Sequence, residues 1–357
     1  MTTERTLCSG NDAVGWAAIY AGCKHFFGYP ITPQNEIAEL MARELPKIGG
    51  TYLQSAGEAE ASYMLFGGGL TGERVMTATS SPGLALMQEA FSHIAMVEAP
   101  VVVVDVMRLG PGAGTGGQQG QTDYRTVTSG VYGGLHYFII APYSVSEIFE
   151  FVQLAFHIAD KYRIMVMVLT DFILGRMSEF IELKSLHFEP LPKKDWALRG
   201  KARKNGRSNS HFTALVFGNI PDFFRSQQDK FQKITESEMR FEAYKTEDAD
   251  LLIASYGSLA RISKGAVNMA RDEGFRVGLF RPITLRPFPK EPLLQKASKA
   301  KKVLVVEDSP GEFVEDVEAA VQGRVPVHLL NIQARHIPGP SGLIFPERIL
   351  EEVRSLL

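Results

Sequence analysis

Apolar positions in the first half of the chain form short runs that alternate with segments of helical periodicity. The two longest runs are continuous, as expected of parallel strands covered on both faces. The predicted strands are His25–Tyr29, Val75–Thr79, Val101–Met107 and Ile164–Thr170. The predicted helices are Ala13–Ala21, Gln34–Glu44, Ala59–Gly67, Leu84–His93 and Val145–Ala159, the last with Ser144 as its N-cap and Glu147 three residues later. This alternation predicts an α/β layer fold.

The second half repeats the pattern more compactly. Its predicted strands are Asp250–Tyr256, Arg276–Phe280, Val303–Val306 and Val327–Leu330, and its predicted helices are Leu259–Glu273 and Glu312–Val321. Gly, Ser and Asn are concentrated between the halves, at Arg199–Ser210. We therefore expect an α/β domain over residues 1–185, a connector over 186–246 and a smaller α/β domain over 247–357.

Composition supports a globular protein of about two domains. The chain has 357 residues, of which 45% are apolar, so disorder is excluded as its main state. Lys and Arg number 38 against 40 Asp and Glu, which gives no overall attraction to nucleic acid or anionic membranes. The first twelve residues lack an apolar signal core, and no run of about 18 apolar residues follows. We expect a cytoplasmic protein that does not enter the membrane.

Cys8 and Cys23 are the only thiols in the sequence. They allow one disulfide at most, and they cannot hold an iron–sulfur cluster or a four-thiolate zinc site. The histidines are scattered without the spacing of metal ligands. We predict no metal site on this chain, so any redox metal in its chemistry must belong to another chain.

Two turns at the ends of predicted strands are candidates for ligand binding, because open α/β sheets bind ligands beyond the carboxyl ends of their strands. The first is Tyr29-Pro30-Ile31-Thr32-Pro33, where prolines fix the backbone and Thr32 lies near a helix N-terminus that favours anions. The second is Ser80-Ser81-Pro82-Gly83. For both turns the simpler alternative is an ordinary hydroxyl N-cap.

Two further turns carry charged residues. Arg108 ends a predicted strand and precedes the glycine-rich stretch Gly110–Gly120. No amphipathic helix follows these glycines, so they favour a loop that closes over a ligand rather than a dinucleotide fingerprint. Arg108 is suited to hold a carboxylate, or it is a solvated arginine beside a surface loop. Glu58 and Glu60 precede an apolar helix, either to complement its dipole or to place a buried carboxylate against a cofactor.

A basic cluster lies in the expected connector, at Lys193, Lys194, Arg199, Lys201, Arg203, Lys204 and Arg207. It contains few aromatic residues, so a solvated linker is favoured over a nucleic-acid patch. The alternative is docking of a phosphate-bearing ligand or partner. No GxSxG turn is present to carry a serine nucleophile.

Several motifs together resemble one family, the alpha-type subunit of 2-oxoacid:ferredoxin oxidoreductases. They are YPITP (29–33), TATSSPG (77–83), the stretch from VVVVDVM to QTDY (101–124) and TDFILG (170–175), followed by three longer stretches at 249–271, 278–289 and 311–327. The YGSLARI and MRLGPGAG forms look closest to the branched-chain (2-oxoisovalerate) group, and the 2-oxoglutarate group is next. The resemblance implies a pyrimidine-binding domain for thiamine diphosphate and a smaller transketolase-C-terminal-like domain.

The resemblance also implies an activity and a division of labour. The reaction would be oxidative decarboxylation of a 2-oxoacid to acyl-CoA and CO₂, with coenzyme A as cosubstrate and electrons passing to ferredoxin. This chain lacks the GDG motif of the family's Mg²⁺–diphosphate site. Mg²⁺ and the 4Fe-4S clusters would lie on a beta-type and a ferredoxin-like partner subunit. A gamma-type subunit is a further expected partner, in a dimer of hetero-oligomers. Thiamine diphosphate would bind between this chain and the beta-type subunit.

Site residues follow from the same resemblance. Thr32 matches the family threonine that contacts the substrate carboxylate, and Arg108 matches the arginine beside it. The cofactor would contact Tyr29, Pro30, Ile31, Glu58, Ser80 and Ser81, where Ser81 replaces a glycine that is common in relatives.

One position departs from the family pattern. The glutamate that bonds the pyrimidine ring in the family falls on Ala56 here, and alanine cannot make that hydrogen bond. Either Glu58 takes this role through a shifted turn, or the cofactor is activated otherwise. A structural or regulatory subunit without chemistry, or a thiamine-dependent enzyme without redox steps, are the alternatives.

Overall fold

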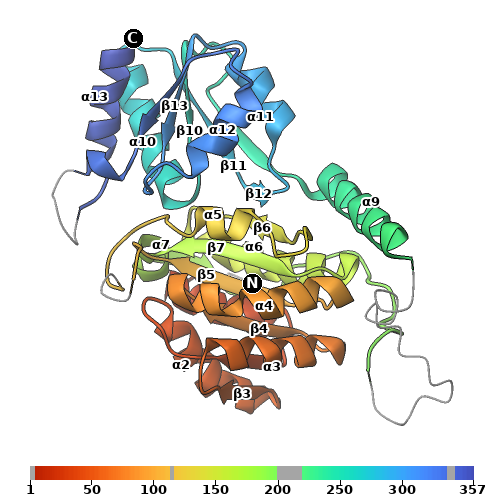
Figure 1. The fold of residues 1–357 in the computed structure, drawn as a ribbon. Helices are drawn as coiled ribbons and strands as arrows, with labels where there is room; N and C mark the ends of the chain where they lie inside the picture. Colours follow the sequence, from red (N-terminus) through yellow and green to blue (C-terminus); the bar gives the residue numbers. More distant parts are fainter. Residues whose placement is uncertain (1–4, 113–115, 199–218, 336–341) are drawn as a thin grey trace.

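The computed structural model describes residues 5–112, 116–198, 219–335 and 342–357. Figure 1 shows two α/β bodies stacked on each other, with a long helix, α9 (Ile220–Glu238), along one side. Each body is built on a sheet of mainly parallel strands. This confirms the α/β fold class that the alternation of apolar runs predicts.

The first sheet has the strand order β12-β6-β7-β5-β4-β2-β3. All neighbours in it are parallel except β12, which comes from the second half of the chain and runs antiparallel to β6. Its strands are β2 (His25–Gly28), β3 (Thr51–Gln54), β4 (Val75–Thr79), β5 (Val102–Met107), β6 (Phe138–Ile140), β7 (Val166–Asp171) and β12 (Thr284–Arg286).

Helices cover both faces of the first sheet, which is why its central strands are continuous apolar runs. On one face pack α1 (Gly10–Tyr20), α2 (Asn35–Glu44) and α6 (Val145–Tyr162). On the other pack α3 (Glu58–Leu70) and α4 (Ser81–Val97). Shorter elements are η1 (Leu45–Ile48), α5 (Tyr124–Thr128) and α7 (Phe172–Arg176). The Ser144 cap of α6 is confirmed, because its hydroxyl accepts the Glu147 amide at 3.1 Å.

The second sheet has the order β14-β13-β10-β11-β9, with only the edge strand β9 antiparallel. Its strands are β9 (Phe241–Tyr244), β10 (Leu251–Ala254), β11 (Val277–Pro282), β13 (Lys302–Val306) and β14 (Val327–Leu330). Its helices are α10 (Gly257–Asp272), α11 (Lys290–Ala297), η4 (Ile332–Ala334), α12 (Phe313–Val321) and α13 (Pro346–Leu356). One hydrophobic cluster extends from α3 and α4 into this body.

Several short or exposed elements, and the amphipathic helix α13, were not predicted. A separate two-stranded antiparallel sheet pairs β1 (Arg5–Ser9) with β8 (Ser178–Glu182). The edge strand β3 is mostly exposed, and β6 and β12 have three residues each. The described parts of the expected connector contain α9 and β9, and β9 belongs to the second sheet. Arg199, Lys201, Arg203, Lys204 and Arg207 lie outside the described residues.

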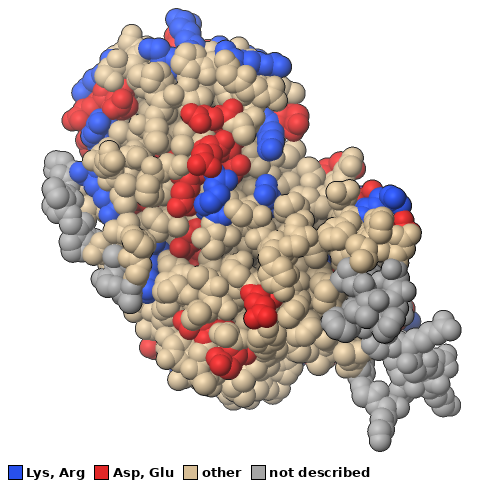
Figure 2. All heavy atoms as spheres, viewed as in Figure 1, with Lys and Arg blue, Asp and Glu red and all other residues tan. Residues whose placement is uncertain are grey.

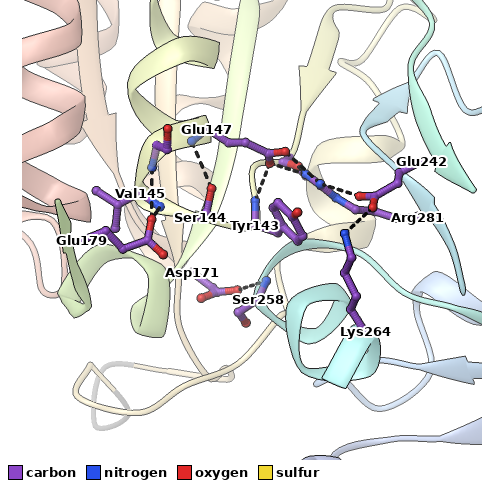
Figure 3. Close-up of polar contacts among 12 residues, drawn as sticks. Tyr143, Ser144, Val145, Glu147, Asp171, Glu179, Glu242, Ser258, Lys264 and Arg281 are labelled. Carbon is purple, nitrogen blue, oxygen red and sulfur yellow. Dashed lines mark hydrogen bonds and ion pairs between the residues drawn. The ribbon is translucent and has the colours of Figure 1, made fainter. Parts of the chain in front are cut away.

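The second body is fixed to the first by buried polar contacts (Figure 3). Arg281 of β11 is fully buried and donates to Glu147 of α6 at 2.9 Å and to Glu242 of β9 at 3.3 Å. Its guanidinium lies 3.7 Å from the centre of the Tyr143 ring. Nearby, the Asp171 carboxylate accepts the Ser258 amide at 3.2 Å. These contacts hold the carboxyl edge of the first sheet against the second body.

Candidate functional site

The first sheet has a topological switch point at β2, which lies between β3 and β4. The chain leaves β2 towards β3 and returns to β4 on the other side, so the loops after β2 and β4 diverge at the carboxyl edge. Such divergence opens a crevice where ligands bind in open α/β sheets. The two loops are the turns predicted from sequence, at Tyr29–Pro33 and Ser80–Gly83. We take this crevice as the candidate site.

Thr32 and Arg108 meet at one side of the crevice. Arg108 follows β5 and is only 4% exposed, and its Nη1 donates to the Thr32 carbonyl at 2.8 Å. Gly116 of the glycine-rich loop lies against both residues, since a Cβ there would stand 3.2 Å from Arg108 Nη1 and 3.5 Å from Thr32 Cβ. Arg108 is therefore not a solvated arginine.

The alternative role of Thr32 as a helix cap is also excluded. Helix α2 begins at Asn35 and its N-cap residue is Gln34, whose side chain donates to the Tyr29 carbonyl at 3.1 Å. This bond fixes the loop that contains Tyr29, Pro30 and Ile31. The Arg108 Nε is buried and has no hydrogen-bond partner among the described residues. The guanidinium thus keeps donor capacity for a ligand carboxylate.

Glu58 is the first residue of α3 and lies beside the start of α4. Its side chain is buried, whereas Ala56, two residues earlier, is exposed. Gly83 belongs to the β4–α4 turn and packs against this carboxylate. A Cβ on Gly83 would stand 2.7 Å from Glu58 Oε1 and 2.3 Å from Thr79 Oγ1, so only glycine fits at this position. The carboxylate of Glu58 therefore faces the turn that contains Ser80 and Ser81.

Ser80 is the N-cap residue of α4, but its side chain makes no capping hydrogen bond. Its hydroxyl is buried without a partner in the described chain, as are the hydroxyls of Thr77 and Thr79 on β4. Buried polar groups are rarely left unpaired in a folded protein. The helix-cap alternative for this turn does not account for Ser80, and a polar ligand in the crevice would.

Ser81 has a left-handed backbone conformation, with φ at +32°. Glycine adopts such a φ without steric cost, which gives a physical reason for the glycine common in relatives. The serine hydroxyl donates to Asp123 Oδ2 at 2.7 Å. This hydrogen bond offsets part of the backbone strain and holds the turn against Asp123.

Asp105 and Asp123 form a buried acidic pair behind this turn that the sequence analysis missed. Burial raises the pKa of Asp105 well above its ordinary value, and the adjacent Asp123 carboxyl raises it further. Burial also raises the pKa of Asp123, while Ser81 and Arg108 oppose that shift. Two adjacent anions repel, so one proton shared by the pair is favoured. An aspartate within the apolar run VVVVDVM was the signal that could have identified Asp105.

The remaining predicted features lie away from the crevice. Cys8 and Cys23 are buried and free, and Lys194 pairs with Asp160 at 2.5 Å. Among the residues that the structure describes, no group of His, Cys, Asp and Glu is arranged to hold a metal ion. Within the same residues, none of the helices combines the length and hydropathy that crossing a membrane requires.

Comparison with protein families matches both bodies. Residues 16–248 match the thiamine diphosphate-binding domain of pyruvate flavodoxin/ferredoxin oxidoreductase. Residues 249–337 match core domain II of pyruvate:ferredoxin oxidoreductase. The family model of the first domain includes all of the crevice residues described above.

Individual relatives agree with these matches. The chain is 39% identical over 351 residues to ketoisovalerate oxidoreductase subunit VorB of Methanothermobacter thermautotrophicus, with 98% of this chain and 97% of that protein covered. It is 38% identical over 330 residues to 2-oxoglutarate synthase subunit KorA of Methanocaldococcus jannaschii, with 87% and 90% covered.

A solved structure is similar over nearly the whole chain. It is 2-oxoglutarate:ferredoxin oxidoreductase from Magnetococcus marinus with 2-oxoglutarate, coenzyme A and succinyl-CoA bound, and it superposes with a TM-score of 0.84 at 25% identity. The match covers 99% of this chain and 65% of that enzyme's chain, so this chain spans about two thirds of its length.

Proposed function

The chain belongs to the pyruvate flavodoxin/ferredoxin oxidoreductase family, and we propose that it supplies the pyrimidine side of a shared thiamine diphosphate site. The assembled enzyme would oxidatively decarboxylate a 2-oxoacid to acyl-CoA and CO₂ and pass the electrons to ferredoxin. The observation that supports this most strongly is the crevice at the β2 switch point. The loops at this switch point bring with them a buried arginine with free donor capacity and a buried glutamate.

The crevice residues fit a thiamine pyrimidine by the chemistry of their polar groups. The buried Ser80 hydroxyl lacks a hydrogen-bond partner among the described residues, and the Glu58 carboxylate lies beside Gly83, where a Cβ would collide with it. When bound, thiamine diphosphate supplies the carbon nucleophile and the electron sink for decarboxylation. Glu58 would accept a hydrogen bond from the pyrimidine ring. It would thereby take the role of the family glutamate, whose position is occupied by Ala56 in this chain. Tyr29, Pro30, Ile31, Ser80 and Ser81 would surround the ring.

Arg108 and Thr32 would bind the substrate carboxylate. Arg108 has buried donor capacity and is already aimed at the Thr32 loop by its 2.8 Å hydrogen bond. A charge-assisted contact of this kind orients the 2-oxoacid with its keto carbon towards the cofactor. A branched-chain 2-oxoacid is favoured, because the ketoisovalerate relative is 39% identical. The 2-oxoglutarate relative, at 38%, keeps that substrate as the second candidate.

Partner subunits would complete the site. In the lower half of Figure 2, where α3 and α4 lie in the foreground of Figure 1, the surface is mostly uncharged. Tyr63 on α3 is 41% exposed and Leu86 on α4 is 60% exposed, so both helices offer apolar side chains to a partner. A beta-type subunit would bring the Mg²⁺–diphosphate half of the cofactor. A ferredoxin-like subunit would bring the iron–sulfur clusters, and a gamma-type subunit would complete the assembly.

The test is turnover of a panel of 2-oxoacids by the reconstituted complex, with coenzyme A and an electron acceptor. The chain alone should be inactive. Glu58→Gln should lower kcat/KM by about 10²–10⁴-fold, the range typical of a proton-transfer group. Glu60→Gln changes an exposed carboxylate on the same turn and is the matched control, expected to stay within about twofold. Thr32→Val and Arg108→Ala should raise KM for the 2-oxoacid while thiamine diphosphate still binds.

Contrary outcomes separate the alternatives. Full turnover of Glu58→Gln would remove Glu58 from the cofactor site. A wild-type complex without 2-oxoacid activity, rescued by Ala56→Glu, would identify a subunit that has lost chemistry. Product formation without any electron acceptor would identify a thiamine-dependent enzyme without redox steps.

A further inference from the structure

The second sheet has a switch point of its own. Strand β10 lies between β11 and β13, so the loops after β10 and β13 diverge at the carboxyl edge. These loops contain Tyr256 and Asp308, and both residues are buried. By the rule that identifies the first crevice, this second crevice is a place for a ligand. In this chain it is filled by a residue from the first domain.

The occupant is Gln121, which follows the glycine-rich loop and is fully buried. Its backbone amide donates to the Asp308 carbonyl at 2.8 Å, and its side-chain oxygen accepts the Asp308 amide at 3.0 Å. Its side-chain nitrogen donates to the Tyr256 carbonyl at 3.2 Å. Gln121 therefore bonds to both walls of the crevice, as a bound ligand would.

A second set of bonds supports this attachment. Arg335 pairs with the Asp308 carboxylate at 2.8 Å and also donates to the Gln119 carbonyl, and the side chains of both members of the ion pair are buried. The Gln119 side chain in turn accepts the Ile173 amide at 3.0 Å. The segment 119–121 is thus held by the second domain on one side and by α7 on the other.

The residues that flank this segment form hydrogen bonds to Arg108 and Leu109 at the base of the glycine-rich loop. The Leu109 amide donates to the Gln118 carbonyl at 3.1 Å, and the Thr122 hydroxyl donates to the Arg108 carbonyl at 3.0 Å. Gly120 packs so tightly on Leu109 that an added Cβ would stand 2.7 Å from the Leu109 Cα. A displacement of Gln121 is therefore transmitted to the backbone of Arg108.

We propose that Gln121 is a positioning residue that fixes Arg108 by anchoring the glycine-rich loop in the switch-point crevice of the second domain. The second domain thereby sets the position of Arg108, with which the first domain binds the substrate carboxylate. This inference rests on the proposed role of Arg108 in substrate binding. It assigns the second crevice to the chain's own loop instead of to a small molecule.

The test is Gln121→Leu in the full chain, assembled with its partners. The variant should raise KM for the 2-oxoacid at least tenfold while kcat stays within threefold and thiamine diphosphate affinity is unchanged. In the chain without partners, hydrogen exchange at the Leu109 and Gly110 amides should accelerate at least tenfold, because both amides bond within the loop base.

Gln153→Leu is the matched control. Gln153 is equally buried and its amide bonds the Phe149 and Lys184 carbonyls and the Leu186 amide, far from the loop in sequence and on the α6 side of the sheet. It should leave both readouts unchanged. If Gln121→Leu does not fold, Asp308→Asn replaces it, because this change weakens the ion pair with Arg335. KM for the 2-oxoacid and hydrogen exchange at Leu109 and Gly110 are then measured for Asp308→Asn, with the same expected changes.

The proposal is overturned if exchange at Leu109 and Gly110 is unchanged in the folded variant, or if the control moves KM equally. The exchange measurement needs no turnover. It therefore tests the anchoring even if the wild-type complex proves inactive towards 2-oxoacids, a result that would count against the proposed function alone.

Discussion

Replacement of Arg281 by methionine should lower the free energy of unfolding by more than the loss of any surface ion pair in this protein would. The Arg281 side chain is fully buried and donates to Glu147, to Glu242 and, at 3.1 Å, to the Ala141 carbonyl. Methionine preserves much of the apolar volume but leaves two partly buried carboxylates facing each other without their shared cation. It also removes the guanidinium from the face of the Tyr143 ring.

The magnitude follows from the burial of each partner. Removing one member of a buried ion pair destabilises a protein by about 3–5 kcal/mol, because an uncompensated charge remains. The Glu147 side chain is 20% exposed and that of Glu242 is 26% exposed, and Lys264 still pairs with Glu242. Residual hydration and this second cation place the expected loss at the lower end, about 3 kcal/mol. Arg276→Met is the matched control and should cost less than about 1 kcal/mol, because Arg276 is largely exposed where it pairs with Asp250.

Equilibrium unfolding in urea measures both variants. Both tryptophans, Trp16 and Trp196, precede the second domain, so fluorescence follows the first domain while circular dichroism follows both. Since Arg281 joins the domains, its loss should also separate the two transitions, whereas Arg276→Met should keep them as close as in the wild type. Equal losses below about 1 kcal/mol in the two variants would refute the reasoning.

Two further predictions concern the cofactor-facing turn. The Ser81→Gly variant should be about 1 kcal/mol more stable than Ser81→Ala. Both variants lose the hydrogen bond to Asp123, but only alanine keeps the strain of the left-handed backbone conformation. Urea midpoints that rank the other way would contradict this. For Asp105, the folded pKa is raised by burial, so the folded state holds the proton longer and stability falls as pH rises above about 4. Asp105→Asn should flatten that fall in thermal unfolding between pH 4 and 8, and an unchanged slope would show that Asp105 does not titrate there.

The sequence patterns predicted the interior strands β5, β7, β10 and β13 but missed the fully buried three-residue strand β6. Val75–Thr79 and Val327–Leu330 are strands with the predicted ends; β4 is fully buried, whereas β14 is an edge strand with one buried residue. The exposed strand β3 and the pair β1–β8 carry polar residues on open faces, so periodicity could not identify them. Helix α9 lies in a segment that composition alone marked as a connector.

The sequence pattern by itself predicted the site only to the level of a sheet edge, and the family resemblance alone implied that Arg108 lies beside Thr32. Parallel strands put the turn at Thr32 and the residue Arg108 on the same carboxyl edge. Their contact depends on the strand order, in which β4 separates β2 from β5 by roughly 10 Å in all. The long Arg108 side chain bridges that distance to the Thr32 carbonyl. The order of strands, and the buried Asp123 behind Ser81, are properties of tertiary packing that no local pattern encodes.

The two switch-point crevices obey one fold rule and differ in how their polar groups are satisfied. In the first, the Ser80 hydroxyl and the Arg108 Nε remain buried without a partner in the described chain. In the second, Gln121 bonds the backbone of both walls. Because unpaired buried polar groups cost free energy, the first crevice retains capacity for an external ligand and the second does not. The two sheets share the same topology at these crevices. What distinguishes the ligand site from the structural anchor is therefore whether the buried polar groups already have hydrogen-bond partners within the protein.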